Sequence, residues 1–381
     1  MRILIVHQFL WAHYKAGIFK NLEQLVDESQ GQDELHIIQT AIFEKARRDF
    51  GKADTSIHNY RYELLFDDVY ENTGYWNRLK KVWARIRAFK PDVINLPGYY
   101  EPAMVTVQFM AKILLRKKII LSVDSTEGDN PNKWYGELLK RIIISLADGF
   151  FCYGKLSADY MLKLGAKEEQ ILMRRNSVNN DLVRKIHDDF KESTDYESEK
   201  RKLPKYNFIF VGRFLAIKNI RLLVETFLKL EKAEDWGLIL VGDGPLREEI
   251  ETFCQGNPSI NSFPPTNWDG VPKRMALADV LVLPSYSEPW GLVTNEAMVC
   301  GKPVIVSQKA GSAHDLVKNG KNGFTFDAYS GDDLLEKLQF FVDNPAAVQS
   351  FGKNAEETIQ EFAPEKVAED MYNGFKRIIA A

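Results

Sequence analysis

The chain has 381 residues, of which 45% are hydrophobic and 27% are charged. This composition is typical of a folded globular protein and excludes a disordered or fibrous chain, while the length suits two domains of about 150 to 200 residues each. The formal net charge of −3 provides no basic excess for binding nucleic acid, so we expect no nucleic-acid partner.

The cysteines and the start of the chain indicate the compartment. Cys152, Cys254 and Cys300 stand far apart without a Cys-x-x-Cys pair, so we expect neither a disulfide framework nor a zinc site. The first apolar run, residues 2–6, is too short for a signal peptide, and no stretch reaches the roughly 18 apolar residues of a membrane-spanning helix. We therefore expect a cytoplasmic protein that begins with a buried strand.

Short apolar runs alternate with segments of helical length along the first half of the chain. Runs without polar alternation are typical of parallel strands that are buried on both faces of a sheet. We predict five such strands, at residues 2–6, 35–39, 92–96, 118–123 and 149–153. They indicate a first doubly wound α/β domain over residues 1–190.

The pattern stops at KESTDYESEKRK, residues 191–202, which is nearly devoid of apolar side chains, and we predict a linker over residues 191–205. It then restarts, and four more strands are predicted at residues 208–212, 237–242, 280–285 and 303–307. The sequence thus predicts a second doubly wound domain over residues 206–363. An amphipathic segment, residues 364–381, closes the chain. Open parallel sheets bind ligands at the carboxyl ends of their strands, so we expect a site between the two sheets.

Residues 78–90, RLKKVWARIRAFK, combine six basic side chains with an apolar stripe at helical spacing. Such a helix can lie on anionic lipid through its basic face. The alternative is that the stripe packs against the sheet, and we favour it because the segment leads directly into a predicted strand. The two interpretations are compatible if only the basic face meets the membrane.

The stretch VGRFLAIKN, residues 211–219, carries two cations past a strand end. Gly212 and Arg213 follow the strand directly, and Lys218 precedes a helical segment. Arg can bind phosphate oxygens in a bidentate manner and Lys supplies a point charge, so this loop suits a diphosphate. A solvated loop is an equally weighted interpretation of this motif by itself.

The stretch GDGP, residues 242–245, partly matches a dinucleotide-binding fingerprint. Arg247 occupies the third glycine position, and the motif follows the second strand of its domain rather than the first. We therefore interpret it as a tight strand-to-helix turn. The chain also has no Walker-type Gly-Lys-Ser/Thr sequence.

The stretch SEPWGLVTNEAMVCGKPVIVS, residues 287–307, predicts a strand-end turn, a short helix and a further strand. The peptide N–H groups of Gly291, Leu292 and Val293 would be unpaired at the helix start, which attracts phosphate. Glu288 precedes that start and Glu296 lies about a turn and a half inside the helix. The two carboxylates are therefore expected to meet different parts of one extended ligand, although a turn residue and a solvated helix residue would also explain them.

Together, VGRFLAIKN, VGDGPLREEIE, SEPWGLVTNEAMVCGKPVIVS and NGFTFD closely resemble the carboxyl-terminal half of the retaining glycosyltransferases of family four. The resemblance covers roughly residues 205–330 and, more weakly, the whole chain. It implies the GT-B fold, in which two Rossmann-like domains face each other across a cleft. It also implies an enzyme that transfers a hexosyl group from a nucleoside diphosphate sugar with retention at the anomeric carbon, as in polysaccharide or glycolipid assembly.

The resemblance assigns roles by position. Arg213 and Lys218 match residues that hold the donor diphosphate, Glu288 matches one that contacts the donor sugar, and Glu296 matches one that binds the ribose hydroxyls. The family pattern further implies a front-face mechanism, and a terminal helix at residues 364–381 that crosses back to the first domain. The chain contains no Asp-x-Asp, so we expect no metal and no cofactor besides the donor.

The amino-terminal half departs from the family. Gly17 is a single glycine where relatives often have a pair whose backbone approaches the diphosphate, and Asp124 stands where they commonly carry histidine. Asp124 could bind the sugar hydroxyls of the donor, bind the acceptor, or only cap a turn. Glu101 is a weaker candidate at another strand end, and His7 and His13 are interpreted as packing or hydrogen-bonding residues rather than a base.

We therefore expect a metal-independent glycosyltransferase with Glu288 and Asp124 as catalytic candidates. Gly17, Gly212, Arg213, Lys218, Gly291, Leu292, Val293 and Glu296, together with Glu288, are the expected donor-binding residues. The expected partners are a nucleotide sugar and an acceptor that is a glycan, a lipid-linked sugar or a small molecule, with peripheral contact to the inner membrane face through residues 78–90. A sugar-nucleotide epimerase of the same fold and a non-catalytic nucleotide-sugar sensor are the alternatives.

Overall fold

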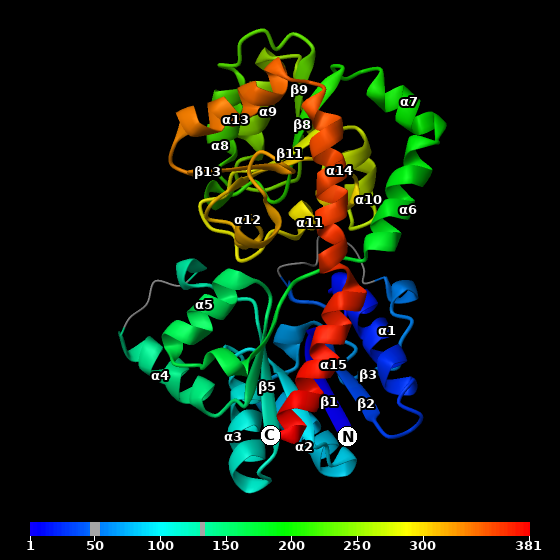
Figure 1. The fold of residues 1–381 in the computed structure, drawn as a ribbon, viewed down its shortest axis with the longest axis vertical. Helices are drawn as coiled ribbons and strands as arrows, with labels where there is room; N and C mark the ends of the chain where they lie inside the picture. The colour runs from blue at the N-terminus through cyan, green and yellow to red at the C-terminus, as the bar shows by residue number, and fades with distance from the viewer. Residues whose placement is uncertain (46–53, 130–133) are drawn as a thin grey trace. The chain divides into compact units, whose positions relative to one another are not determined.

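The computed structural model describes residues 1–45, 54–129 and 134–381. The chain forms two units, shown in Figure 1. Unit 1 contains Met1–Asn179 together with Pro364–Ala381, and unit 2 contains Asn180–Ala363. Within these ranges no helix combines the length and the apolar character needed to cross a lipid bilayer.

Unit 1 is built on a parallel sheet of seven strands in the order β3-β2-β1-β4-β5-β6-β7. The strands are β1 (Arg2–Phe9), β2 (Glu34–Ala41), β3 (Glu63–Leu64), β4 (Val93–Pro97), β5 (Lys118–Val123), β6 (Gly149–Cys152) and β7 (Ile171–Arg174). The helices are α1 (Tyr14–Asp27), α2 (Tyr75–Phe89), α3 (Pro102–Leu114), α4 (Trp134–Ser145), α5 (Lys155–Leu164) and α15 (Pro364–Ala380).

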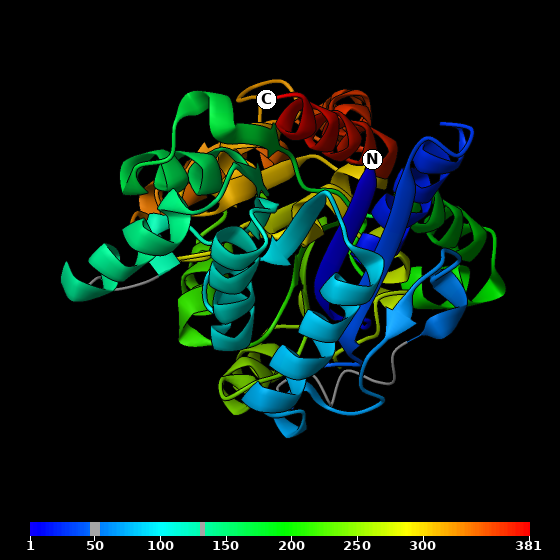
Figure 2. The same ribbon diagram turned by 90° about the horizontal axis from the view of Figure 1, so that it is seen from below.

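Both faces of this sheet are covered, as the non-alternating apolar runs predict. Ile3 and Ile5 of β1 share a buried cluster with side chains of α1 and α15. Leu4 and Val6 of the same strand share another cluster with side chains of α2 to α5. Figures 1 and 2 show α15, in red, running beside α1. The segment expected to return to the first domain is this helix.

Helix α2 contains most of the basic amphipathic segment at residues 78–90. Its stripe residues Leu79, Val82 and Ile86 are buried in the core of unit 1. On the other faces, Arg78 pairs with Glu101, Arg85 pairs with Glu63, and Lys81 donates a hydrogen bond to the Leu65 carbonyl. The apolar stripe therefore packs inside the unit, and three of the basic side chains have partners within the protein.

Unit 2 is built on a parallel sheet of six strands in the order β10-β9-β8-β11-β12-β13. These are β8 (Tyr206–Val211), β9 (Trp236–Val241), β10 (Ile260–Phe263), β11 (Val280–Leu283), β12 (Val304–Ser307) and β13 (Gly323–Phe326). Its helices are α6 (Asn180–Lys191), α7 (Thr194–Lys200), α8 (Ile220–Phe227), α9 (Arg247–Gly256), α10 (Gly270–Ala276), α11 (Leu292–Val299), α12 (Gly311–Leu316), α13 (Gly331–Asp343) and α14 (Ala347–Ile359).

The expected linker at residues 191–205 needs correction. Its residues include helix α7 and belong to unit 2, and the division between the units falls after Asn179 rather than near residue 190. The Ser193 hydroxyl caps α7 by accepting a hydrogen bond from the Tyr196 N–H, and Glu199 forms an ion pair with Arg274 of α10. A polar segment can thus be helical when its side chains cap the helix and find partners.

Candidate functional site

The loop after β8 is fixed against the loop after β9. The Gly212 N–H donates to the Val241 carbonyl at 3.0 Å, and the Phe214 N–H donates to the Asp243 carbonyl at 2.7 Å. A Cβ atom on Gly242 would lie 1.9 Å from the Gly212 carbonyl oxygen, so a side chain there would force the loops apart. The GDGP turn thus supports the loop that carries Arg213. The Arg213 side chain is exposed, and the described ranges provide no hydrogen bond or ion pair for it.

Lys218 is held by the residue that follows it. Asn219 has a left-handed backbone, with φ of 56°, and its side-chain amide donates to the carbonyls of Pro284 and Ala328 at 3.2 and 2.9 Å. These carbonyls follow β11 and β13, so Asn219 ties the loop after β8 to two other strand ends. This arrangement fixes the backbone that presents Lys218.

Lys218 and Glu288 form an ion pair. Only 17% of the Lys218 side chain and 16% of the Glu288 side chain are exposed. The backbone of Glu288 is also held, because its N–H donates to the Lys309 carbonyl at 3.3 Å and its carbonyl accepts from the Gly311 N–H at 3.0 Å. The sequence assigned these two residues to different parts of a ligand, whereas the structure brings them into direct contact.

Helix α11 begins at Leu292, directly after Gly291, which has φ of 88°. A Cβ atom at Gly291 would lie 2.7 Å from a methyl carbon of Leu283 and 3.2 Å from Cγ of Glu288. Glycine is therefore needed both for the conformation and for the space. The predicted helix start is present, with Leu292 and Val293 in the first turn, whose N–H groups have no partners inside a helix.

Glu296 is an almost fully buried residue of α11, 9% exposed. Burial raises the pKa of its carboxyl to about 8. The alternative of a solvated helix residue does not fit this burial. At neutral pH the carboxyl is mostly protonated, so it can both donate and accept hydrogen bonds.

A pocket of about 300 Å³ opens at the carboxyl edge of the unit 1 sheet. Asp124, which follows β5, lines it together with residues from the loops after the neighbouring strands. Its other lining residues include Trp11, Lys15, Tyr100 and Tyr153. Lys15 and Tyr153 were not anticipated from the sequence, because a single lysine or tyrosine near a strand end carries no local signal of a site.

Gly17 lies inside α1 and not in the loop after the first strand, where the sequence placed it. It is buried, and a Cβ atom there would lie 3.3 Å from Pro364 at the start of α15. In the structure it allows α1 to pack closely against the end of another helix. Its expected contact with a donor stays a prediction.

The two histidines of this region pack against aromatic rings. The His7 ring meets Phe19 edge-on and makes a hydrogen bond of 2.9 Å with the Gln39 side chain. Burial lowers the pKa of His7 to about 4, so the ring is neutral at pH 7. His13 meets the rings of Trp11 and Tyr14 edge-on. Packing and hydrogen bonding are therefore the roles that the geometry supports for His7.

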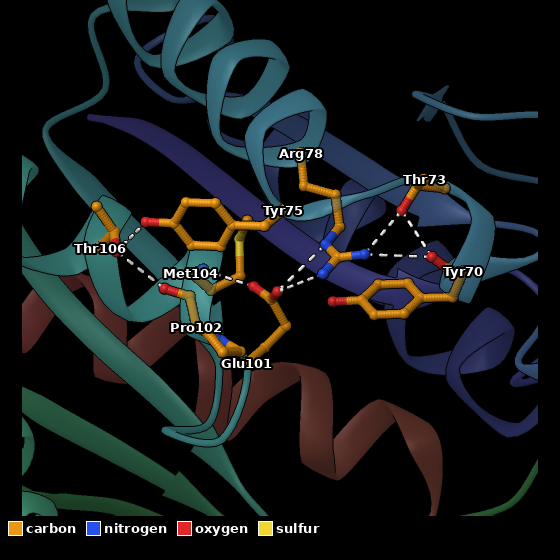
Figure 3. A network of polar contacts seen from close by, with 8 residues as sticks. All are labelled: Tyr70, Thr73, Tyr75, Arg78, Glu101, Pro102, Met104 and Thr106. Carbon is orange, nitrogen blue, oxygen red and sulfur yellow. Dashed lines mark hydrogen bonds and ion pairs between the residues drawn. The ribbon is translucent and has the colours of Figure 1, made fainter.

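Glu101 caps a helix and pairs with a cation, as Figure 3 shows. One carboxylate oxygen accepts from the Met104 N–H at 2.5 Å, and the other lies 3.0 Å from the Arg78 guanidinium. The Arg78 guanidinium in turn lies 4.3 Å from the centre of the Tyr70 ring. These contacts explain Glu101 as a structural residue, since both carboxylate oxygens are engaged inside the unit.

Among residues 1–45, 54–129 and 134–381, no group of three or more His, Cys, Asp or Glu side chains is arranged to hold an ion.

Residues 192–358 match the family model described as glycosyl transferases group 1. An uncharacterized glycosyltransferase of Methanocaldococcus jannaschii is 34% identical over 164 residues, which are 42% of this chain and 45% of that protein. The sulfoquinovosyl transferase of Arabidopsis thaliana is 32% identical over 173 residues, 43% of this chain and 33% of that protein. The matched region thus spans less than half the length of these curated relatives.

Solved structures share the fold over nearly the whole chain. The structure of the Anabaena protein HepE in complex with UDP superposes with a TM-score of 0.74 at 17% sequence identity. The match covers 99% of this chain and 100% of the HepE chain. The sucrose-phosphate synthase of Thermosynechococcus elongatus gives a TM-score of 0.73 at 19% identity, with 100% and 99% coverage. The expected fold of two doubly wound parallel-sheet domains is confirmed.

Proposed function

We propose that this chain, whose residues 192–358 belong to glycosyl transferases group 1, is a retaining hexosyltransferase that uses a nucleoside diphosphate sugar and needs no metal. The observation that carries the proposal is the cluster at the strand ends of unit 2. It combines the Lys218–Glu288 ion pair, the exposed cation of Arg213, which has no partner within the described ranges, and the start of α11. HepE, which shares the fold, has been crystallised with UDP-glucose, and this supports a nucleotide-sugar donor.

The donor diphosphate would change the partner of Lys218. In the free protein the ammonium group of Lys218 is neutralised by Glu288. Two phosphate groups close to Arg213 and Lys218 would attract both cations, and the N–H groups at the start of α11 would add further stabilisation. Glu288 would then be released to face the donor sugar, where a carboxylate favours the positive charge that develops at the anomeric carbon.

The nucleoside side of the donor would meet Glu296. A buried, protonated carboxyl can accept from one ribose hydroxyl and donate to another without the cost of burying a charge. This role agrees with the pKa of about 8 for Glu296. It also explains why a carboxyl group would be kept inside α11, with 9% of the residue exposed.

The transfer itself would follow a front-face course. The bond between the anomeric carbon and the leaving phosphate oxygen breaks, and the acceptor oxygen bonds to the same face of that carbon. The acceptor proton passes to the leaving phosphate oxygen. Cations at Arg213 and Lys218 would stabilise the departing diphosphate, in the place that a metal ion takes in other transferases.

Asp124 is proposed to bind hydroxyl groups of the acceptor or of the donor sugar, because it lines the pocket of unit 1. The acceptor would be a glycan, a lipid-linked sugar or a small molecule. A cytoplasmic location with contact to the inner membrane face is proposed as well. Lys80, Arg87 and Lys90 are the cations of residues 78–90 that would make this contact, because Arg78, Lys81 and Arg85 have partners inside the unit.

The proposal is tested by incubating the protein with UDP-, GDP- and ADP-sugars, with and without candidate acceptors, and measuring released nucleoside diphosphate. A donor should first be found by the rise in melting temperature that it causes. Release with a new α-linked product from an α-linked donor supports retention, which anomeric proton NMR reports. A binding-only sensor would release nothing, and an epimerase would give an altered sugar nucleotide without any acceptor.

A further inference from the structure

We propose that the pocket of unit 1 recognises an acceptor that carries a phosphate or carboxylate group, and that Lys15 is the residue that binds this anion. The inference rests on the proposed function, since it names the chemical class of acceptor for the same reaction. It uses residues that lie outside the donor site of unit 2. Phosphate and carboxylate share the same chemistry here, because both present negatively charged oxygens, and in either case the rest of the acceptor would carry hydroxyl groups.

Lys15 is a buried lysine whose Nζ atom has no hydrogen-bond partner within the described residues, and burial lowers its pKa to about 7. Only 5% of the residue is exposed, and its Nζ atom makes no hydrogen bond. The centre of the Tyr153 ring lies 3.3 Å from Nζ, and the Asp124 carboxylate interacts with Lys15 electrostatically and favours its charged form. A cation–π contact compensates only part of the hydration that a buried ammonium group loses, and its three donors stay unused. Anionic oxygens would satisfy them.

The position of Lys15 in the helix adds to the argument. Lys15 is the second residue of α1, and the first turn of this helix contains no acidic residue. The start of a helix carries partial positive charge, so it is an unfavourable place for a cation and a favourable one for an anion. The N–H groups of Lys15 and Ala16 already donate to the carbonyls of Ala12 and His13, so a bound anion would pair with the ammonium group and gain from the helix dipole without contacting these N–H groups.

The remaining lining describes the rest of the ligand. Asp124 and Glu44 place two carboxylates in the pocket, and Trp11 and Tyr100 place two large rings there. Carboxylates accept hydrogen bonds from hydroxyl groups, and aromatic faces pack against the C–H faces of a sugar ring. The volume of about 300 Å³ suits one monosaccharide-sized body. A ligand with hydroxyl groups near Asp124 and an anionic group near Lys15 would therefore satisfy both the carboxylate and the ammonium group of the pocket.

The donor diphosphate offers the same oxygens, so the experiment must separate the two sources. Binding of four probes is measured by calorimetry: glucose 6-phosphate, glucuronate, methyl glucoside and UDP. The proteins are the wild type, Lys15→Met, Lys15→Gln and Lys20→Met. Lys20 is an exposed lysine on the same helix and serves as the matched control. Melting curves establish that each variant is folded.

We expect wild type and Lys20→Met to bind at least one anionic probe about tenfold or more tightly than methyl glucoside. In Lys15→Met and Lys15→Gln that preference should disappear, while UDP affinity stays unchanged. Equal affinity for all sugar probes in the wild type, or an anion preference that survives both substitutions, overturns the proposal. A loss of UDP affinity in the Lys15 variants assigns the anion to the donor and overturns the acceptor claim.

Binding of the three sugar probes can be measured without a donor and without any enzymatic turnover. An anion preference that depends on Lys15 can therefore be found even if no nucleoside diphosphate is ever released. Conversely, release of nucleoside diphosphate without any anion preference would support the proposed transferase function and would reject only the inference about Lys15.

Discussion

The ammonium group of Lys218 pairs with the carboxylate of Glu288, which follows it by 70 residues in the chain. Lys218 comes from the loop after β8 and Glu288 from the loop after β11, and these strands are neighbours in the sheet. Both side chains are mostly buried, and in the proposed function a bound diphosphate would replace Glu288 as the partner of Lys218. In the proposed function, the pair would link donor binding to the release of the Glu288 carboxylate.

Replacing Glu288 by Gln should lower kcat about 100-fold or more, while the donor dissociation constant changes only a few-fold. The reason is that the carboxylate is needed when charge develops at the sugar, and less when the donor binds. Steady-state rates and donor calorimetry test this. Glu249→Gln is the control, because Glu249 forms an ion pair with Arg221 elsewhere in unit 2. Turnover at the wild-type level in Glu288→Gln would sink the claim.

Replacing Arg213 by Ala should weaken binding of the nucleoside diphosphate about tenfold or more, which is the usual effect of losing a charge-assisted hydrogen bond. The melting temperature should not change, since the side chain is exposed. Calorimetry with UDP or the donor identified by screening measures the loss. Arg201→Ala removes another exposed cation, whose side chain is 80% exposed, and should have no effect. Equal affinities in the two variants would contradict the assignment.

Replacing Glu296 by Gln should stabilise the protein at high pH and not at low pH. Burial raises the pKa of Glu296 in the folded state from 4.5 to about 8. The folded state therefore retains a proton that the unfolded state releases, so this group's stabilisation is lost as the pH rises from 4.5 to 8. The difference amounts to at most about 5 kcal/mol.

The measurement for Glu296→Gln is its melting temperature relative to wild type at pH 5 and at pH 9. The gain should be larger at pH 9. Glu225→Gln is a suitable control, because Glu225 is exposed on α8. A gain of the same size at both pH values would show that the carboxyl ionises normally in the folded protein.

Replacing Gly291 by Ala should destabilise unit 2 by about 1–3 kcal/mol and reduce donor affinity. The added Cβ would lie 2.7 Å from a methyl carbon of Leu283, and the alanine backbone would have to keep φ near 88°. Relief of this contact would shift the start of α11 that follows. Thermal melting and donor calorimetry report the two effects. Gly256→Ala, which would meet nothing within 4 Å, should preserve both quantities, and an equal response of the two variants would refute the argument.

Transfer should continue at full rate after treatment with excess EDTA. Arg213 and Lys218 are proposed to neutralise the diphosphate in place of a metal ion, and the sequence contains no Asp-x-Asp. The assay compares the initial release of nucleoside diphosphate before and after chelation and after adding manganese. A strict need for manganese would show that these cations are not sufficient.

The strand-end positions of the candidate residues in unit 2 could be predicted because these residues lie in short contiguous motifs. Gly212, Arg213 and Lys218 share one loop, and the helix start at Gly291 follows Glu288 closely. Position relative to a strand end is a local property, which apolar runs and glycines report. The contact between Lys218 and Glu288 was not predicted, since it depends on which strands are neighbours. The order of strands in a sheet is not encoded in any one segment.

The pocket of unit 1 was the least predictable part. No local sequence signal distinguishes Lys15 from a solvated lysine, and only its packing beside Tyr153 in the folded unit shows that it is buried. The sequence also placed Gly17 in the loop after the first strand, whereas it lies inside α1 where this helix meets Pro364. Lys15 and Tyr153 are distant in the sequence, as are Gly17 and Pro364, so no local pattern shows that they meet.

The sequence by itself determined the nine interior strands of the two sheets, because a strand covered on both faces requires a continuous apolar run. The four strands that it did not reveal, β3, β7, β10 and β13, are the outer strands of their sheets. An outer strand has a neighbour on one side only, so its sequence is less constrained and its pairing is decided by the tertiary structure. The tertiary structure also decides the charge of Lys15 and Glu296, because burial sets the pKa of each side chain. The motifs at the strand ends of unit 2, by contrast, are specified by local sequence.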